Sequence, residues 1–275
     1  MTRSQTSCGA ARPHAAAALF ALALVVLPLA GCGTTTQAEG GRAAAPVVPR
    51  ASSPEALAAL PEANTFGELK SAPADPAHEL PAGGEVLHPK ADAAIYRAPG
   101  AEPIARLPET QIGSPTWVPV IARQGDWAQV LLPTRPNGAT GWLHATPETV
   151  ESARNDFEVR VDLAGFRLEI LEAGKQTGSW TIGTGKPQHP TPTGRAFILA
   201  SIKESVNTYS PIVLPLSSHS DSHETFGGGP GTVGLHTWPD DSFVGKATSD
   251  GCIRVTREAL DRLVELPLGT VVHIT

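Results

Sequence analysis

Ser249-Asp250-Gly251-Cys252-Ile253-Arg254 is a polar turn that carries a thiol, and Thr232-Val233-Gly234-Leu235-His236 is an alternating stretch that ends 16 residues before Cys252. Successive residues of a strand face opposite sides, so His236 faces away from the apolar side of this stretch. The pattern predicts a strand that presents His236 on its polar face. It also predicts a turn in which Cys252 is well placed for activation.

The sequence around these two stretches predicts a mainly β fold with one helix near the C-terminus. Phe157-Glu158-Val159-Arg160-Val161-Asp162-Leu163 and Arg167-Leu168-Glu169-Ile170-Leu171-Glu172 alternate in polarity and read as a hairpin. Thr256 can cap a helix whose apolar residues follow at helical spacing. Val271-Val272-His273-Ile274 then predicts a closing strand.

The pairing of Cys252 with His236 is suited to nucleophilic chemistry. A free thiol has a pKa near about 8.5, so it needs a base or a positive environment to react at neutral pH. His236 is the candidate base, and Arg254 could add positive charge. The backbone N–H groups of Asp250, Gly251 and Cys252 could hold a developing oxyanion. From the residues alone, His236 could equally be a structural strand histidine, and Cys252 an inert buried thiol.

Two sets of motifs in this half of the chain resemble the YkuD-type L,D-transpeptidase family. One joins Gly234-Leu235-His236-Thr237 to residues 243–255, and the other joins Gly183-Thr184-Gly185-Lys186-Pro187 to Thr191-Pro192-Thr193-Gly194. The resemblance covers residues 155–275 and implies a β-rich catalytic domain that needs no cofactor or metal.

The resemblance also implies a reaction and a set of roles. Cys252 would attack the carbonyl of the third residue of a peptidoglycan tetrapeptide stem and expel the terminal D-alanine. A side-chain amine of a second stem would then resolve the thioester and form a 3→3 cross-link. His236 would act as general base and then acid, and the carbonyl of Thr237 would orient it. Substrate contacts would come from Tyr209, His219, Trp238 and Arg254.

Asp250 and Thr237 depart from the residues that many family members carry. Asp250 puts a carboxylate two residues before the thiol, where it would oppose thiolate formation unless it points outward or pairs with Arg254. The roles of Asp250 and Thr237 use their backbone atoms, so we expect activity to survive both departures.

Three other functions remain open at this stage. Water instead of an amine could resolve the thioester, which would make the protein an L,D-carboxypeptidase. A wall-binding lipoprotein without activity is a second reading. A metal hydrolase built on His219, His223 and Glu224 is a third, but these residues lack the HExxH order of a zinc helix.

The N-terminus predicts export and lipid attachment. Arg3 and Arg12 precede the apolar residues 15–30, a run shorter than the ~20 residues that span a bilayer. Leu29-Ala30-Gly31-Cys32 resembles a lipobox, which implies that residues 1–31 are a signal peptide and that Cys32 carries a lipid. The protein would then lie at the outer face of the bacterial cytoplasmic membrane. Ordinary signal cleavage or an uncleaved anchor remains possible.

Residues 32–84 are rich in Pro and Ala and predict a disordered linker. Residues 85–150 contain short β-rich runs between turn signals and resemble a small bacterial SH3-like barrel, although an immunoglobulin-like sandwich is possible. The 21 Lys and Arg residues are outnumbered by 27 Asp and Glu residues, so a nucleic-acid partner is excluded. The 3 cysteines are too few for a disulfide scaffold.

Overall fold

The computed structural model describes residues 47–50, 53–80, 84–205, 209–225 and 229–275. The expected signal peptide, Cys32 and the first part of the expected linker lie outside the described residues. None of the helices in the described ranges has the length and apolar character needed to cross a membrane.

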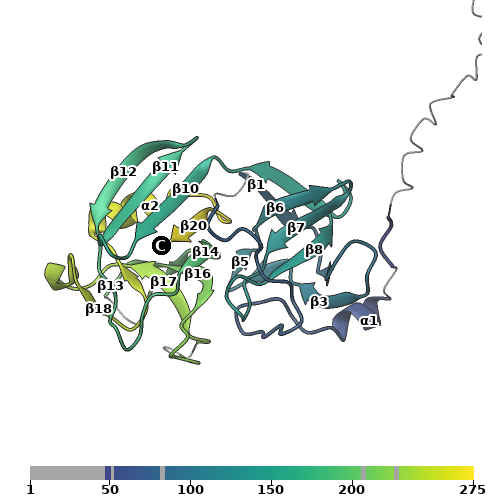
Figure 1. Cartoon of the computed structure of the whole chain (residues 1–275), viewed down its shortest axis with the longest axis horizontal. Coiled ribbons are helices and arrows are strands. Elements are labelled where there is room, and N and C mark those ends of the chain that lie inside the picture. The colour runs from purple at the N-terminus through teal and green to yellow at the C-terminus, as the bar shows by residue number, and fades with distance from the viewer. Residues whose placement is uncertain (1–46, 51–52, 81–83, 206–208, 226–228) are drawn as a thin grey trace, which may run out of the picture. The chain divides into compact units, whose positions relative to one another are not determined.

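The expected β-rich unit after residue 84 is a seven-stranded antiparallel sheet (Figure 1). Its two edge strands, β3 and β9, do not pair with each other, so the closed small barrel that we expected is not confirmed in the described part of the chain. Apolar side chains on one face build a core that includes Leu87, Val118 and Val130. In spatial order the strands are β3 (Pro103–Leu107), β2 (Ala93–Tyr96), β8 (Thr140–His144), β7 (Trp127–Leu131), β6 (Val118–Gln124), β1 (Glu85–Pro89) and β9 (Val150–Arg154).

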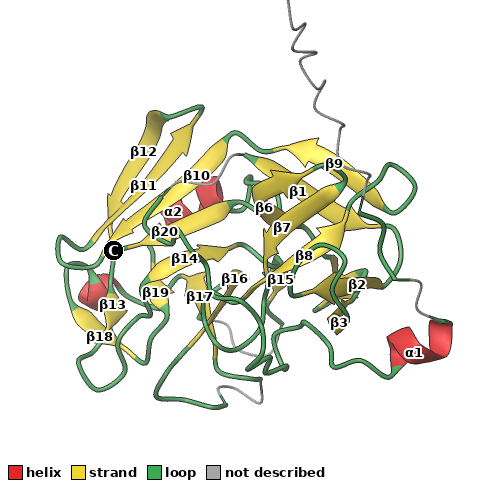
Figure 2. Cartoon of the chain, turned by 45° about the vertical axis from the view of Figure 1, so that its right-hand side comes forward, coloured by secondary structure: helices red, strands yellow, loops and turns green. Residues whose placement is uncertain are grey.

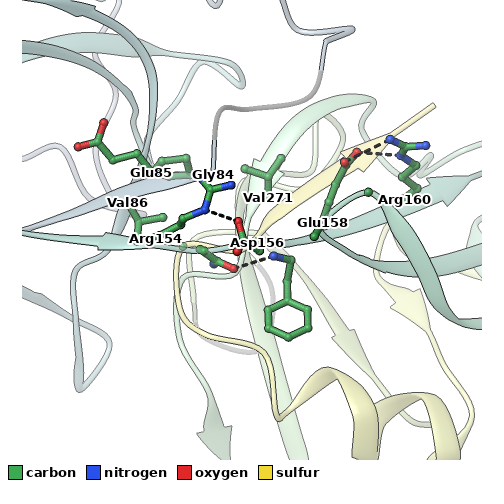
Figure 3. A pocket seen from close by; sticks show the side chains of 14 residues that line it. Gly84, Glu85, Val86, Arg154, Asp156, Glu158, Arg160 and Val271 are labelled. Carbon is green, nitrogen blue, oxygen red and sulfur yellow. Dashed lines mark hydrogen bonds and ion pairs between the residues drawn. The ribbon is translucent and has the colours of Figure 1, made fainter.

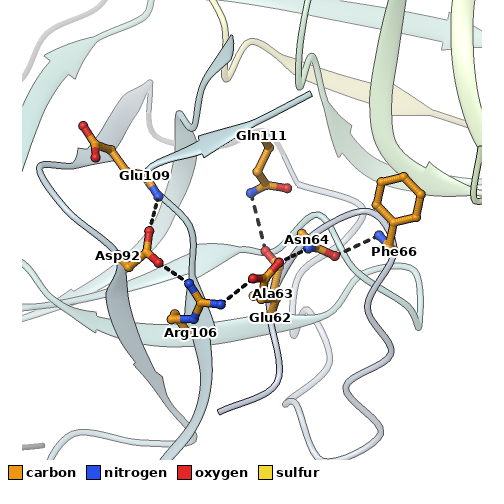
Figure 4. A network of polar contacts seen from close by, with 8 residues as sticks. All are labelled: Glu62, Ala63, Asn64, Phe66, Asp92, Arg106, Glu109 and Gln111. Atoms are coloured by element: carbon orange, nitrogen blue, oxygen red, sulfur yellow. Dashed lines mark hydrogen bonds and ion pairs between the residues drawn. The ribbon is translucent and has the colours of Figure 1, made fainter. Parts of the chain in front are cut away.

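Residues 62–75, which we name the strap, correct part of the linker prediction. The strap follows helix α1 (Pro54–Ala58), and its side chains Ala63 and Leu69 are buried in the core of the seven-stranded sheet. Figure 4 shows how Arg106 of β3 bridges Glu62 of the strap and Asp92. The strap is therefore packed, although its composition resembles that of a linker.

The second half of the chain confirms the mainly β prediction. The predicted hairpin is the antiparallel pair β10 (Phe157–Asp162) and β11 (Arg167–Glu172). These strands lie in a five-stranded sheet of order β12 (Lys175–Thr181), β11, β10, β20 (Val271–Ile274) and β14 (Gly194–Phe197). A four-stranded sheet has the order β15 (Ile202–Lys203), β16 (Ile212–His219), β17 (Thr232–His236) and β19 (Ile253–Arg254).

The predicted helix after Thr256 is α2 (Arg257–Leu263). The Thr256 hydroxyl accepts from the Ala259 N–H, as an N-cap does. Leu260 and Leu263 of α2 join one core with strands of both sheets. Figure 2 draws α2 in red among these strands. Short elements complete the fold: β4 (Thr110–Gln111), β5 (Ser114–Pro115), β13 (Thr184–Gly185), β18 (Ala247–Ser249) and the 3-10 helix η1 (Asp241–Phe243).

The two halves share core residues and a buried ion pair. Phe197 of β14 and Leu199 pack into the core of the seven-stranded sheet. Arg195 of β14 donates to Asp75 of the strap at 2.7 Å, and both side chains are almost completely buried. The strap and β14 are thus joined by a paired charge that neither could bury alone.

A pocket of about 290 Å³ lies where β9 leads into β10 (Figure 3). Four of its charged side chains form two ion pairs, since Arg154 pairs with Asp156 at 2.6 Å and Arg160 pairs with Glu158 at 2.9 Å. No His, Cys or Ser is among the described residues that line it, so this pocket lacks the nucleophile and base that the sequence predicts.

Candidate active site

Strand pairing brings Cys252 and His236 to one cavity. β17 and β19 run in parallel, with Leu235 opposite Ile253 and His236 opposite Arg254. One step back along both strands, Gly234 lies beside Cys252. Cys252 and His236 both line a cavity of about 410 Å³. The structure therefore brings the candidate nucleophile and the candidate base to one cavity.

His236 is buried and held in one orientation. Its ring atom Nδ1 lies 2.7 Å from the carbonyl oxygen of Thr237, so Nδ1–H donates to that oxygen and Nε2 is left as the acceptor. Burial lowers the pKa of His236, the bond to Thr237 raises it, and the charge of Arg254 lowers it. The net direction is downward, so the imidazole is neutral at neutral pH and can accept a proton.

The thiol of Cys252 is also held in its neutral form. Burial raises its pKa, while the backbone N–H of Gly234 and the positive charge of Arg254 lower it. Asp250 adds a smaller upward contribution. Because the net shift is upward, a neutral thiol faces a neutral imidazole at rest. Such a pair reacts when the imidazole takes the proton during attack.

The turn before Cys252 is fixed by hydrogen bonds. Gly251 has φ 115°, a conformation that favours glycine, and its N–H donates to Ser249 Oγ at 3.2 Å. Its carbonyl accepts from Thr191 Oγ1 at 2.8 Å. The N–H of Gly251, which the sequence suggested for an oxyanion site, is therefore engaged within the turn.

Asp250 pairs with Lys186 rather than with Arg254. Its carboxylate accepts from Lys186 Nζ at 2.6 Å, and this bond is the main reason that the pKa of Asp250 is lowered. From the sequence we expected the Asp250 carboxylate either to point outward or to pair with Arg254. Its partner is instead Lys186, which belongs to the motif at residues 183–187. Lys186 thereby offsets the charge that Asp250 places near the thiol.

Asp250, His189 and His223 are the group in the described chain that could hold a metal ion. One ligand atom from each lies within 4.8 Å of the other two. The two imidazole rings stack at 4.0 Å between centroids. A divalent cation there would have to displace the ammonium of Lys186 from Asp250, so the carboxylate is already satisfied by a positive charge.

Three of the four predicted substrate contacts lie around Cys252 and His236. Tyr209 lines the cavity, and its ring meets the ring of His236 edge-on at 5.0 Å between centroids. The guanidinium of Arg254 lies over the ring of Trp238, 3.7 Å from its centroid. Trp238 and Arg254 flank the cavity without lining it.

His219 corrects the fourth of these predictions. The residue is 1% exposed, and its Nε2 lies 2.7 Å from the carbonyl oxygen of Thr65 and 3.0 Å from its hydroxyl. Its backbone N–H donates to Asn137 Oδ1 at 2.8 Å. His219 therefore joins β16 to the strap and does not face substrate. His219 is also not in the group of described residues that could hold a metal ion, which contains His223 and His189, so the structure does not support the ligand pair of a metal hydrolase.

Three residues from the first half of the chain line the cavity, and the sequence did not predict any of them. They are Thr65 and Phe66 of the strap and Ile112 of the turn between β4 and β5. Phe66 is 69% exposed and Ile112 is 38% exposed, which is unusual for large apolar side chains. The only signal in the sequence is Ile112-Gly113, an apolar residue placed where a tight turn favours Asn or Gly.

Comparison with known proteins finds relatives of the second half of the chain. Residues 156–274 match the sequence profile of the YkuD L,D-transpeptidase catalytic domain. The second half of the chain is thus similar to the YkuD family. A Bacillus licheniformis protein, named for YkuD-type L,D-transpeptidase activity, is 30% identical over 120 residues. That match covers 43% of this chain and 66% of the relative, just under two thirds of the relative's length.

Solved structures of L,D-transpeptidases also resemble the chain. The catalytic domain from E. faecium, determined by NMR, is 22% identical over 44% of this chain and 98% of its own length, with a TM-score of 0.35. L,D-transpeptidase 3 from Mycobacterium tuberculosis, solved with a faropenem-derived adduct, is 12% identical over 54% of this chain and 91% of its own length, with a TM-score of 0.38.

Proposed function

We propose that the protein is a peptidoglycan L,D-transpeptidase that forms 3→3 cross-links through a thioester on Cys252. The observation that carries this proposal is the neutral pair of Cys252 and His236 on one cavity, with Nδ1 of His236 fixed by Thr237. The YkuD family match over the same residues supports the substrate class, a tetrapeptide stem.

In the first half of the reaction, Nε2 of His236 takes the thiol proton as Sγ of Cys252 attacks the carbonyl of the third stem residue. The tetrahedral intermediate carries an oxyanion, which the N–H groups of Asp250 and Cys252 would stabilise. The bond to the terminal D-alanine then breaks, and His236 returns the proton to the departing amine. The product is a thioester on Cys252 and free D-alanine.

In the second half, the side-chain amine of another stem attacks the thioester carbonyl. The new C–N bond forms as the C–S bond breaks, and the electron pair returns to sulfur. His236 accepts the proton of the attacking nitrogen and passes it to Cys252. If water attacks instead, the same steps release a tripeptide, which is the L,D-carboxypeptidase alternative.

Attachment through Cys32 would hold the enzyme at the outer face of the cytoplasmic membrane, where stem peptides are found. The seven-stranded sheet would correspond to the SH3-like module that the sequence predicts at residues 85–150. A wall-binding role without activity remains the alternative if Cys252 proves unreactive.

The test is incubation of the full chain with a purified tetrapeptide stem, followed by mass spectrometry of the products. We expect release of D-alanine and a cross-linked dimer, both lost in Cys252→Ala and reduced at least about 100-fold in His236→Gln. A matched control is Cys32→Ser, which keeps the thiol at Cys252. Products of equal yield from Cys252→Ala would overturn the proposal.

A second test uses the opening of a β-lactam ring by the thiol. A carbapenem should add once to the protein in intact-mass spectra, and the adduct should be absent from Cys252→Ala. An adduct that survives this substitution would place the reactive group elsewhere.

A further inference from the structure

We propose that Phe66 of the strap and Ile112 form an apolar subsite for the aliphatic side chain of the acceptor, which favours an amine over water as the group that resolves the thioester. This inference rests on the proposed function and concerns its second half. It assigns a role to a part of the chain that lies outside the family match at residues 156–274.

The first argument is the chemistry of the cavity wall. Among the described residues that line it there is no Lys, Arg, Asp or Glu, and six are apolar. The six are Phe66, Ile112, Ile202, Val213, Pro215 and Pro230. A wall without a carboxylate cannot hold an ammonium ion, and an apolar environment favours the neutral form of an amine. The neutral form is the one that attacks a thioester.

The second argument concerns where the carboxylate of the donor, the tetrapeptide stem that forms the thioester, can bind. The departing D-alanine carries a carboxylate, and no Lys or Arg among the described lining residues could form an ion pair with it. The planar guanidinium of Arg254 lies outside the lining, on the ring of Trp238, and suits a carboxylate. With the donor's charge on the side of Arg254, the apolar cavity is left for the second substrate.

The third argument is that hydrogen bonds of the strap fix the backbone of Phe66 at the cavity. The N–H of Phe66 donates to Asn64 Oδ1 at 2.9 Å, and Thr65 is bonded to Thr232 at 2.6 Å between hydroxyl oxygens. A Cβ on Gly67 would lie 2.3 Å from the carbonyl oxygen of Glu62, so the chain is tightly turned there. Figure 4 shows Phe66 at the end of this network, pointing away from Arg106.

The fourth argument is the backbone of Ile112. Its φ of 48° and the φ of 71° at Gly113 give positive values at both central residues of the turn, as in a type I′ turn. A β-branched residue is strained in this conformation, where Asn would be favoured. A strained apolar residue that lines the cavity of the nucleophile is expected where function requires it.

Together, the apolar lining residues would exclude water from the cavity and bind the aliphatic part of the acceptor amine. The amine nitrogen attacks the thioester carbonyl, the C–S bond breaks, and the amine proton reaches Sγ through His236. Water would follow the same route but gains nothing from an apolar wall. Each buried methylene of the acceptor should improve aminolysis by about 3- to 4-fold.

The experiment measures how one thioester partitions between amine and water. The full chain is given the tetrapeptide donor with n-alkylamines from ethylamine to hexylamine, and amide and tripeptide products are counted by mass spectrometry. The ratio of amide to tripeptide does not depend on the amount of active enzyme. We expect it to rise with chain length in the wild type.

We expect Phe66→Ser to lower this ratio about 5- to 10-fold and to flatten its dependence on chain length, while Phe66→Leu retains both. The matched control is Val264→Ser, an exposed apolar residue that does not line the cavity. An unchanged ratio in Phe66→Ser, or only tripeptide from the wild type, would overturn the inference and leave Cys252 chemistry intact. A wild type that consumes no donor would overturn the proposed function itself.

Discussion

Two regions of the molecule line the cavity of Cys252, the paired strands β17 and β19 and the strap, and different contacts hold them in place. β17 and β19 are held by parallel strand pairing, which belongs to the backbone and survives most substitutions. The strap is held by backbone hydrogen bonds to β3 and to residues 135–140, by its buried side chains Ala63 and Leu69, and by contacts with the second half of the chain. These contacts are chiefly Asp75 on Arg195 and Thr65 on His219. One wall is thus a property of the sheet. The other also depends on a buried ion pair, which a single substitution can disrupt.

The largest effect should come from the buried ion pair. Asp75→Ala leaves the guanidinium of Arg195 buried without its carboxylate, and we expect a loss of about 3 to 5 kcal/mol in the free energy of unfolding, measured in urea. Asp75→Asn keeps some of the hydrogen bonds and should lose less. This milder variant remains informative if Asp75→Ala does not fold.

A matched control for that measurement is Arg257→Ala, which breaks an exposed pair with Asp261. It should cost less than about 0.5 kcal/mol. Equal losses from the two substitutions would show that the strap is not held by its buried charge.

The next effect is a dependence of stability on pH through His219. Burial lowers the pKa of His219 from 6.5 to about 4. The unfolded chain therefore binds a proton first as the pH falls below 6.5, and stability is lost between that value and about 4. By pH 4.5 the loss should be about 2 to 3 kcal/mol.

Urea unfolding at pH 7.0 and pH 4.5 measures this loss, and its comparison with His219→Gln isolates the contribution of one residue. Glutamine cannot be protonated in this range but can still donate to Thr65. The same pH dependence in both proteins would mean that His219 is not responsible.

A smaller effect of opposite sign is expected at the turn between β4 and β5. Ile112→Asn should relieve the strain of positive φ and stabilise the protein by about 0.5 to 1 kcal/mol in thermal or urea unfolding. It should also lower the ratio of amide to tripeptide. Destabilisation by this substitution would show that Ile112 is placed for packing and not for the cavity.

The smallest effect concerns the reactivity of Cys252, which lies beside the paired strands β17 and β19. Asp250 raises the pKa of Cys252 slightly, so Asp250→Asn should speed alkylation of Cys252 by iodoacetamide about 2- to 3-fold near neutral pH. Intact-mass spectra over time give the rate. Slower alkylation in Asp250→Asn would mean that the pairing with Lys186 activates the thiol.

The part of the cavity that β17 and β19 form was predictable because its determinants are local. Alternation around His236, the glycine of the turn and the cap at Thr256 each specify a structure within a few residues, and all three were confirmed in the fold. The distance of 16 residues between His236 and Cys252 is short enough for neighbouring strands to bring them together.

The strap was not predictable from composition, because its packing depends on partners far along the chain. Asp75 and Arg195 are 120 positions apart, and Thr65 and His219 are 154 positions apart. Proline and alanine are common in both linkers and packed irregular segments. His219 was misread for the same reason, since nothing near it in the sequence reveals Thr65 as its partner.

The contacts of residues 47–50 with the seven-stranded sheet would also limit how far the proposed enzyme could reach from a lipidated Cys32. A disordered linker from Cys32 to residue 84 would have 52 residues and a contour length of about 180 Å at full extension. Because Trp127 Nε1 donates to the carbonyl oxygen of Val47, the chain already contacts the folded body at Val47, and only 15 residues separate it from Cys32, about 50 Å at most. The enzyme would then work on the layer of wall nearest the bilayer.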